Sequence, residues 1–301
     1  MDVANFAAIL DSAVRLSVPV LCAALAGLWS ERAGIIDIGL EGKLLAAAFA
    51  GATVAALTGS ASLGLLAALG ASVTLSLLHG YGAIDRGGDQ IVCGMAFNMI
   101  AAGATALAGA AIFGEGGRTP SLSGAGRFEP ILAGHDALTW IALACAPVSM
   151  FALYRTRFGL RLRAAGEDPH ALEAAGVCVR RVRYGGAAIC GGLCGLGGAH
   201  LALTQAAGFL PGMSAGKGFI ALAALVFAKW RPGAALVVCL AFGGLEATAI
   251  RLQGVELPGI GAIPVQAVQA LPYLLTVILL AGFIGRSHGP AAAGTPYTKG
   301  A

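Results

Sequence analysis

The chain alternates between long apolar stretches and short polar segments along most of its length. A transmembrane helix needs about 20 mostly apolar residues to cross a hydrocarbon core of about 30 Å. Stretches of this kind predict membrane-spanning helices at 12–29, 41–58, 61–82, 90–113, 136–154, 184–206, 232–250 and 264–285. The pattern predicts an all-α polytopic membrane protein of about 8–10 transmembrane helices. We expect one transmembrane domain at 1–286 and a flexible C-terminal tail at 287–301.

One further apolar stretch, residues 218–228, is too short to cross a bilayer. A helix of that length covers about half of the hydrocarbon core. We expect a half-helix or a short buried crossing beside a cavity. Residues 30–40 could hide another crossing, so the pattern leaves the side of the N-terminus open.

Composition supports a membrane protein and excludes several other classes. Charged residues make up 11% of the chain, against about 25% in a soluble domain. Apolar residues reach 57% and the mean hydropathy is +0.82. These values exclude a disordered chain, and a net charge of +4 provides no dominant basic surface for nucleic acid.

Glycine is abundant, and its spacing in one stretch favours close packing of helices. Gly191 and Gly195 in the stretch GGAAICGGLCGLGGAH have the small-xxx-small spacing that lets two helix backbones approach. The stretch has no G-x-G-x-x-G pattern, so a dinucleotide site is a poor alternative.

The distribution of positive charge predicts an orientation. Residues 155–183 contain seven arginines and three acidic residues, a net charge equal to that of the whole chain. The positive-inside rule places this segment in the cytoplasm. The segment 114–135 is then external, and 85–89, 229–231 and Arg286 are cytoplasmic.

A short helix is predicted within this cytoplasmic segment, which we name the coupling segment (155–183). Asp168 suits an N-cap, Pro169 the first helical position and Gly176 the residue after the C-cap. The predicted helix, 169–175, is too short to be stable alone in water. It is either a coupling helix that docks into a soluble partner or a surface turn with basic flanks facing anionic lipid.

A second charged segment lies between two apolar stretches, at residues 30–43, which we name the elbow. It contains Glu31, Arg32, Asp37, Glu41 and Lys43, and glycines at 34, 39 and 42. Charge at membrane depth is costly and is usually paired internally, and glycines permit an irregular backbone there. We favour an ion-paired elbow that fixes the fold, with gating and direct substrate contact as alternatives.

Polar and aromatic residues inside the predicted helices are candidates for lining a translocation pathway. Gln90 and Asn98 are eight residues apart and share roughly one helix face. Gln205 ends one predicted helix, and Phe219 could stack on a base or a sugar. Each has an alternative role, in interhelical hydrogen bonding for the amides and in packing for the aromatic ring.

Sequence motifs for catalysis are missing from the chain. It contains no G-x4-G-K-[ST] phosphate loop, no HExxH and no histidine cluster. We expect no enzyme activity, no metal site and no cofactor, and ATP use by a separate subunit.

Three strings in the chain resemble the permease subunits of ABC importers. GEDPHALEAAG at 166–176 resembles their coupling segment, which often reads Glu-Ala-Ala followed by Gly. LWSERAGIIDIGLEGKLLAAAFAGA at 28–52 and GMSAGKGFIALAALVFAKWRPGAAL at 212–236 resemble the nucleoside/simple-sugar branch of the branched-chain amino acid, ribose and nucleoside family. That branch usually has Asn where this chain has Asp37.

The resemblance implies roles for two groups of residues. The ATPase-coupling group is Asp168, Pro169, Glu173, Ala174, Ala175 and Gly176. The structural or gating signature is Glu31, Arg32, Asp37, Gly39, Glu41 and Gly42.

The resemblance also implies a type II ABC importer permease in the bacterial plasma (inner) membrane that transports nucleosides or a related small polar solute. Its expected partners are an ABC ATPase subunit, a second permease subunit that is a longer paralogue, an external substrate-binding lipoprotein or periplasmic protein, and membrane lipid, with no nucleic acid. A simple-sugar or branched-chain amino acid permease is an alternative. An ion-coupled secondary transporter is another, although no repeat relates 12–113 to 136–285.

Overall fold

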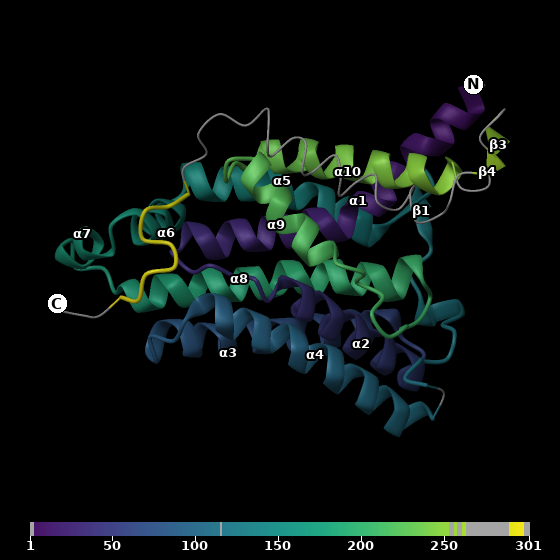
Figure 1. The fold of residues 1–301 in the computed structure, drawn as a ribbon, viewed down its shortest axis with the longest axis horizontal. Coiled ribbons are helices and arrows are strands. Elements are labelled where there is room, and N and C mark those ends of the chain that lie inside the picture. Colours follow the sequence, from purple (N-terminus) through teal and green to yellow (C-terminus); the bar gives the residue numbers. More distant parts are fainter. Residues whose placement is uncertain (1–2, 115, 253–255, 258–260, 263–288, 298–301) are drawn as a thin grey trace.

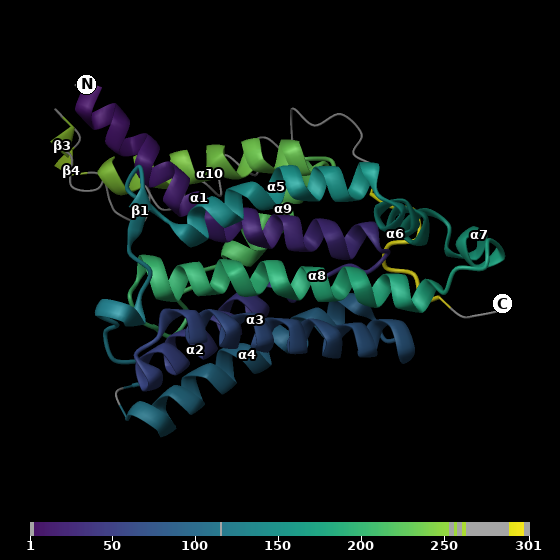
Figure 2. The same cartoon turned by 180° about the vertical axis from the view of Figure 1, so that it is seen from behind.

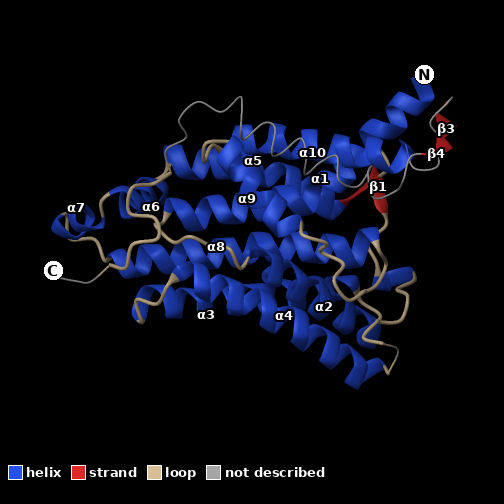
Figure 3. Ribbon diagram, in the orientation of Figure 1, coloured by secondary structure: helices blue, strands red, loops and turns tan. Residues whose placement is uncertain are grey.

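Helices account for most of the described chain (Figure 3). The computed structural model describes residues 3–114, 116–252, 256–257, 261–262 and 289–297. Within these ranges seven helices are long and apolar enough to cross a membrane. They are α1 (Val3–Arg32), α2 (Leu40–Thr58), α3 (Ala61–Gly80), α4 (Gln90–Phe113), α5 (Ala137–Arg155), α8 (Val179–His200) and α10 (Pro232–Leu252).

Shorter elements connect these helices. They are the helices α6 (Arg157–Glu167), α7 (Pro169–Ala174) and α9 (Lys217–Phe227), the π-helices η1 (Tyr81–Asp85) and η3 (Leu201–Gln205), and the 3₁₀-helix η2 (Gly124–Gly126). Two small antiparallel pairs join β1 (Pro130–Leu132) to β2 (His135–Asp136) and β3 (Glu256–Leu257) to β4 (Gly261–Ala262).

The predicted membrane-spanning stretches agree with the helices of the described chain, and the short stretch at 218–228 becomes α9. The predicted helix at 264–285 lies outside the described residues. Residues 33–39 contain no helix, so the segment left open in the sequence holds no hidden helical crossing. The helix α6 within the coupling segment was not predicted.

The helices α1 and α8 form the centre of the bundle (Figures 1 and 2). The helix α8 packs against α1, α2 and α3, and α1 also packs against α5, α9 and α10. Leu21, Leu25 and Leu28 of α1 are fully buried in this core. By contrast, most of α4 is exposed in the isolated chain.

The close approach predicted for the glycines of α8 is confirmed. A Cβ atom added at Gly191 would lie 2.5 Å from the Cα of Val73, and one at Gly195 would lie 2.8 Å from the Cα of Leu69. Real Cβ atoms do not come this near to a backbone, so α3 and α8 pack at a distance that only glycine allows.

The two ends of the bundle differ in content. Figures 1 and 2 both place α6, α7 and the tail residues 289–297 at one end, and β1 with the start of α1 at the opposite end. The coupling segment and the segment 114–135 therefore lie at opposite ends, as the charge distribution predicted.

Candidate functional site

The helix α7 has the capped structure that its sequence predicts. Asp168 is the N-cap, and its side chain accepts a hydrogen bond from the backbone N–H of Ala171 at 3.0 Å. Pro169 is the first helical residue. Gly176 has a φ of +76° and donates its N–H to the carbonyl of Glu173 at 2.8 Å, which ends the helix in the left-handed conformation.

The exposed face of α7 is formed by small residues. Ala174, Ala175 and Gly176 are exposed, whereas Leu172 is 6% exposed and anchors the helix to the core. Because these side chains are small, a neighbouring protein could approach the backbone at this protruding tip closely. This geometry can fit a groove on a soluble partner.

The helix α6 connects α7 to the bundle. Thr156 caps α6 by accepting a hydrogen bond from the N–H of Gly159 at 3.0 Å. At the other end of α6, a Cβ atom at Gly166 would lie 2.4 Å from the carbonyl oxygen of Arg32. The base of α7 therefore lies directly against the end of α1, where the elbow begins.

The first charged residues of the elbow hold the turn between α9 and α10. The indole N–H of Trp230 donates to the carboxylate of Glu31 at 2.6 Å. The guanidinium of Arg32 donates to the carbonyl of Trp230 at 3.1 Å and lies 3.8 Å from the carboxylate of Glu167 in α6. This end of the elbow therefore joins α1, α6 and the α9–α10 turn.

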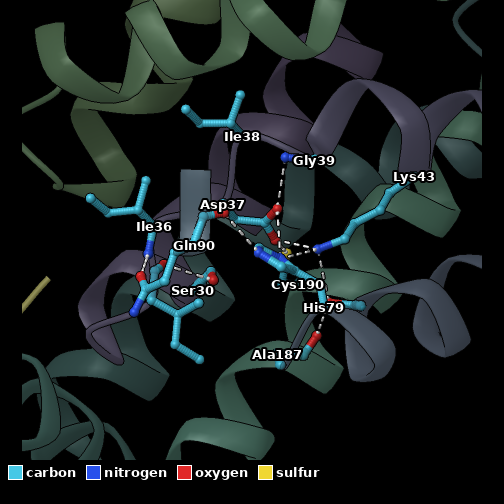
Figure 4. A network of polar contacts seen from close by, with 12 residues as sticks. Ser30, Ile36, Asp37, Ile38, Gly39, Lys43, His79, Gln90, Ala187 and Cys190 are labelled. Atoms are coloured by element: carbon cyan, nitrogen blue, oxygen red, sulfur yellow. Dashed lines mark hydrogen bonds and ion pairs between the residues drawn. The ribbon is translucent and has the colours of Figure 1, made fainter. Parts of the chain in front are cut away.

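Asp37 is the centre of a buried polar network (Figure 4). Its carboxylate is 1% exposed and forms an ion pair with Lys43 of α2. The Nδ1 atom of His79 in α3 lies 3.3 Å from Asp37 Oδ1, and the thiol of Cys190 in α8 donates to Oδ2 at 3.2 Å. The N–H of Gly39 donates to the same carboxylate at 3.0 Å. One carboxylate therefore ties the elbow to three helices.

Glu41 holds the start of the short helix α9. Its two carboxylate oxygens accept hydrogen bonds from the N–H groups of Gly216 at 2.8 Å and Gly218 at 2.7 Å. These are N–H groups at a helix start that have no partner within the helix. A Cβ atom at Gly218 would lie 2.5 Å from the backbone of Glu41, so α9 contacts α2 closely at this point.

Two of the three glycines of the elbow have a different use from the one predicted. Among the three, only Gly34 has a positive φ, +88°. Gly39 and Gly42 have ordinary backbone angles and face α4, where a Cβ atom at Gly42 would lie 2.8 Å from the Cα of Asn98. Their small size therefore admits α4, and the irregular backbone needs only Gly34.

The two amides predicted to line the pathway both bind the elbow. Gln90 accepts a hydrogen bond from the N–H of Ile36 at 2.7 Å. Asn98 accepts from the N–H of Gly42 at 2.7 Å and donates to the carbonyl of Ile38 at 2.9 Å. The two amides therefore form hydrogen bonds with backbone groups of the elbow that have no partner within a helix.

Of the other two pathway candidates, Phe219 lies next to this group and Gln205 lies apart from it. Phe219 is on α9, next to Gly218, and its side chain is 44% exposed. Gln205 is at the opposite end from α7, donates to the carbonyl of Arg15 at 2.6 Å, and lines a cavity of about 410 Å³ that includes Arg127. The structure thus groups the elbow residues with Gln90 and Asn98 and leaves Gln205 separate.

Several residues of this site were not predicted. His79, Cys190 and Trp230 all bind acidic residues of the elbow. Lys43, by contrast, was predicted as one of the paired charges of the elbow, and it forms an ion pair with Asp37. His79 and Cys190 come from helices far along the chain, so no local pattern connects them to Asp37.

A bundle of apolar helices with a charged, buried elbow and a protruding capped helix at one end defines a membrane transport subunit. The chain belongs to the family described as "Branched-chain amino acid transport system / permease component", whose model matches residues 9–280.

Curated relatives agree with this family over nearly full length. The chain is 38% identical to the guanosine ABC transporter permease protein NupQ of Bacillus subtilis, over 100% of this chain and 99% of that protein. It is 33% identical to the nucleoside ABC transporter permease protein NupC of Lactococcus lactis, over 94% of each chain. It is also 33% identical to the putative glucose ABC transporter permease protein TsgC13 of Haloferax volcanii, over 94% of each chain.

The chain is therefore the permease subunit of an ABC importer, a transport component rather than an enzyme, and a multi-pass protein of the plasma membrane. Membership of an ABC system implies an ATPase and a substrate-binding partner.

Proposed function

We propose that this chain forms the translocation pathway for nucleosides in an ATP-driven importer. The observation that carries the proposal is the 38% identity to a guanosine permease over the whole chain. The nucleoside permease of Lactococcus lactis supports it. The glucose permease relative keeps a simple sugar as the second candidate.

The coupling role belongs to α7 and its exit. The group Asp168, Pro169, Glu173, Ala174, Ala175 and Gly176 forms the capped helix and its exposed tip. Docking of this tip on an ABC ATPase would pass the ATPase's movement to α6 and to the end of α1. The chain itself holds no cofactor in this proposal, and ATP is used by the ATPase.

The remaining partners follow from the same proposal. A second permease subunit, a longer paralogue of this chain, completes the pathway, and an external lipoprotein or periplasmic protein delivers the solute. Exposed apolar side chains on α4, such as Met99 (74% exposed) and Leu107 (77% exposed), face lipid or the second subunit.

The pathway wall is assigned to the elbow and the helices next to it. Phe219 is the candidate for stacking on a base, because its ring is exposed on α9. Gln90 and Asn98 position the wall through the elbow backbone. Gln205 lines the cavity at the end opposite α7, where we place the external entrance.

Uptake measurements test the solute. Cells that lack their own nucleoside uptake would receive the complete transporter, the transporter without this chain, or the transporter with an inactivated ATPase. We expect labelled guanosine to enter only with the complete system, with competition by unlabelled nucleosides and none by glucose or leucine. Uptake of labelled glucose without uptake of guanosine would replace the solute by a sugar. Uptake with the inactivated ATPase would indicate an ion-coupled transporter.

Cysteine labelling tests the orientation. The exposed native Cys178 lies in the coupling segment, so it is first replaced by Ser. We expect a cysteine at Ala171 to react only from the cytoplasmic side and one at Ser123 only from outside, since both positions are exposed at opposite ends. Labelling of both from the same side would contradict the orientation.

A further inference from the structure

The described part of the C-terminal tail, residues 289–297, crosses the end of the bundle that carries α7 (Figure 1). The N–H of Ala292 donates to the carbonyl of Gly166 at 2.8 Å, and the N–H of Ala291 donates to the carboxylate of Glu167 at 3.3 Å. These bonds attach the tail to the end of α6, immediately before α7. The expectation of a flexible tail at 287–301 stays a prediction, and the structure adds a bound position for this part.

The same residues also contact the elbow and the α9–α10 turn. Gly289 packs against the ring of Trp230, where an added Cβ atom would lie 3.1 Å away. Gly294 has a φ of +80° and packs against Ile36, where an added Cβ atom would lie 2.9 Å from Cδ1. The tail thus contacts the elbow directly at Ile36 and indirectly through the indole that binds Glu31.

Tyr297 is the last described residue of the tail, and it contacts α7. Its phenol donates a hydrogen bond to the carboxylate of Glu173, and its ring lies 5.4 Å from the ring of His170. Burial and the hydrogen bond to Glu173 raise the pKa of Tyr297 to about 12. The phenol therefore keeps its proton, and donates to Glu173, throughout the physiological pH range.

The ring of Tyr297 also contacts a buried cation. The guanidinium of Arg183 in α8 lies 5.6 Å from the centre of the Tyr297 ring. The residue is 1% exposed, and in the described part of the chain none of its three guanidinium nitrogens has a hydrogen-bond partner. A buried cation needs electrostatic compensation, and an aromatic face supplies part of it. Arg183 also lies against Gly34 of the elbow.

We propose that Tyr297 is a positioning residue that fixes α7 relative to α8 and the elbow during ATP-driven transport. The proposal rests on the coupling role of α7 proposed above. On its own α7 has only six residues, of which Pro169 and Leu172 are buried, so its position needs outside support. Tyr297 supplies it by binding Glu173 through its hydroxyl and Arg183 through its ring, so movement of α7 is passed to α8 and the elbow.

The first experiment measures the position of α7 without transport. A spin label at Ala174 is introduced into the complete chain with Cys178 replaced by Ser, and the label's mobility is measured in proteoliposomes. We expect Tyr297→Leu to increase the mobility clearly and Tyr297→Phe, which keeps the ring on Arg183, to increase it less. Tyr81→Phe is the matched control, since Tyr81 lies at the same end and its hydroxyl binds Arg86 instead of α7. Unchanged mobility in Tyr297→Leu would overturn the proposal.

The second experiment measures coupling in the reconstituted transporter. Guanosine imported and ATP hydrolysed are measured in the same vesicles. We expect Tyr297→Leu to lower the ratio of guanosine to ATP by about fivefold or more, a typical size for coupling between sites, at normal membrane abundance and normal ATPase association. An unchanged ratio would overturn the coupling part even if the label moves more freely.

The two proposals can fail separately. If the wild-type transporter imports no nucleoside, the proposed function is wrong, and the label mobility still tests Tyr297. If Tyr297→Leu lowers the abundance of the chain, the proposal is tested with Tyr297→Phe instead, because this variant removes only the hydroxyl. A normal label mobility and a normal ratio in Tyr297→Phe would then overturn the proposal.

Discussion

The elbow (30–43) and the coupling segment (155–183) both interrupt apolar helices with charge, but their charges have opposite environments. The side chains of Asp37 and Lys43 in the elbow are 1% and 0% exposed. In the coupling segment the side chains of Glu167 and Arg180 are 54% and 64% exposed. One segment therefore has charges fixed by protein partners, and the other has charges that are mostly solvated.

The difference explains how the two segments can act. A charge inside the bundle is tolerated only with a fixed partner, because the surroundings solvate it poorly. The elbow is therefore held rigidly, and it can transmit movement without bending. A segment with solvated charges and a small buried anchor is free to meet a soluble partner. Arg183 is the exception in the coupling segment, and it is the residue that contacts Tyr297.

The largest effect is expected from breaking the buried ion pair of the elbow. Asp37→Ala leaves Lys43 buried without an anion, and removal of one partner from a buried pair costs about 3–5 kcal/mol. We expect a large loss of membrane abundance and a lower thermal midpoint in detergent. The double variant Asp37→Ala with Lys43→Met should recover most of the loss, since no unpaired charge remains. Normal abundance of the single variant would show that the pair does not stabilise the elbow.

A smaller effect is expected from removing the cap of α9. Glu41→Ala leaves the N–H groups of Gly216 and Gly218 without their carboxylate partner, at a cost of about 1–3 kcal/mol. We expect a moderately lower thermal midpoint and strongly reduced guanosine uptake. Glu41→Gln keeps one acceptor oxygen, so it should lie between Glu41→Ala and the wild type. Wild-type uptake and stability in Glu41→Ala would contradict the capping role.

A still smaller effect on stability, with a specific loss of function, is expected at the exit of α7. Gly176 has a φ of +76°, and no atom lies within 4 Å of an added Cβ atom. Gly176→Val therefore strains only the backbone, by about 1–2 kcal/mol. We expect normal abundance, weaker co-purification of the ATPase and reduced uptake. Gly176→Asn is the matched control, because Asn tolerates this conformation. If Val leaves association and uptake unchanged, α7 is a surface turn.

The sequence predicted the elements whose form is set by short-range rules. The bilayer sets the length of the apolar helices, so α4 was predicted with its observed bounds. Local capping chemistry placed Asp168, Pro169 and Gly176 correctly on α7. The close packing of α8 against a neighbouring helix was predicted from the spacing of Gly191 and Gly195.

The remaining features depend on contacts between distant parts of the chain. Asp37 meets Cys190 across 153 positions, and Tyr297 meets Glu173 across 124. No local pattern predicts which residues will meet at such separations. The same reason explains Gln90 and Asn98, whose spacing predicted a shared helix face but not the backbone groups that they bind. The resemblance showed that Asp37 stands where the family branch usually has Asn. The structure shows that Asp37 forms an ion pair with Lys43.

The smallest effect is expected from an exposed ion pair at the α7 end, which completes the comparison with Asp37 and Lys43. Arg180 Nε lies 2.6 Å from Asp85 Oδ1, a contact as short as many buried ones. Its guanidinium is solvated, however, and Tyr184 also donates to Asp85 at 2.9 Å, so Asp85 keeps a partner when Arg180 is removed.

We therefore expect Arg180→Gln to leave the thermal midpoint unchanged at physiological salt, because exposed pairs contribute little and salt screens them. A small decrease should emerge only at low ionic strength, so the midpoint is measured at both salt concentrations beside Asp37→Ala. A decrease in Arg180→Gln that approached the decrease in Asp37→Ala would show that burial does not separate the two segments. A salt-dependent decrease confined to Arg180→Gln would show that burial, and not contact distance, decides which charges hold this permease together.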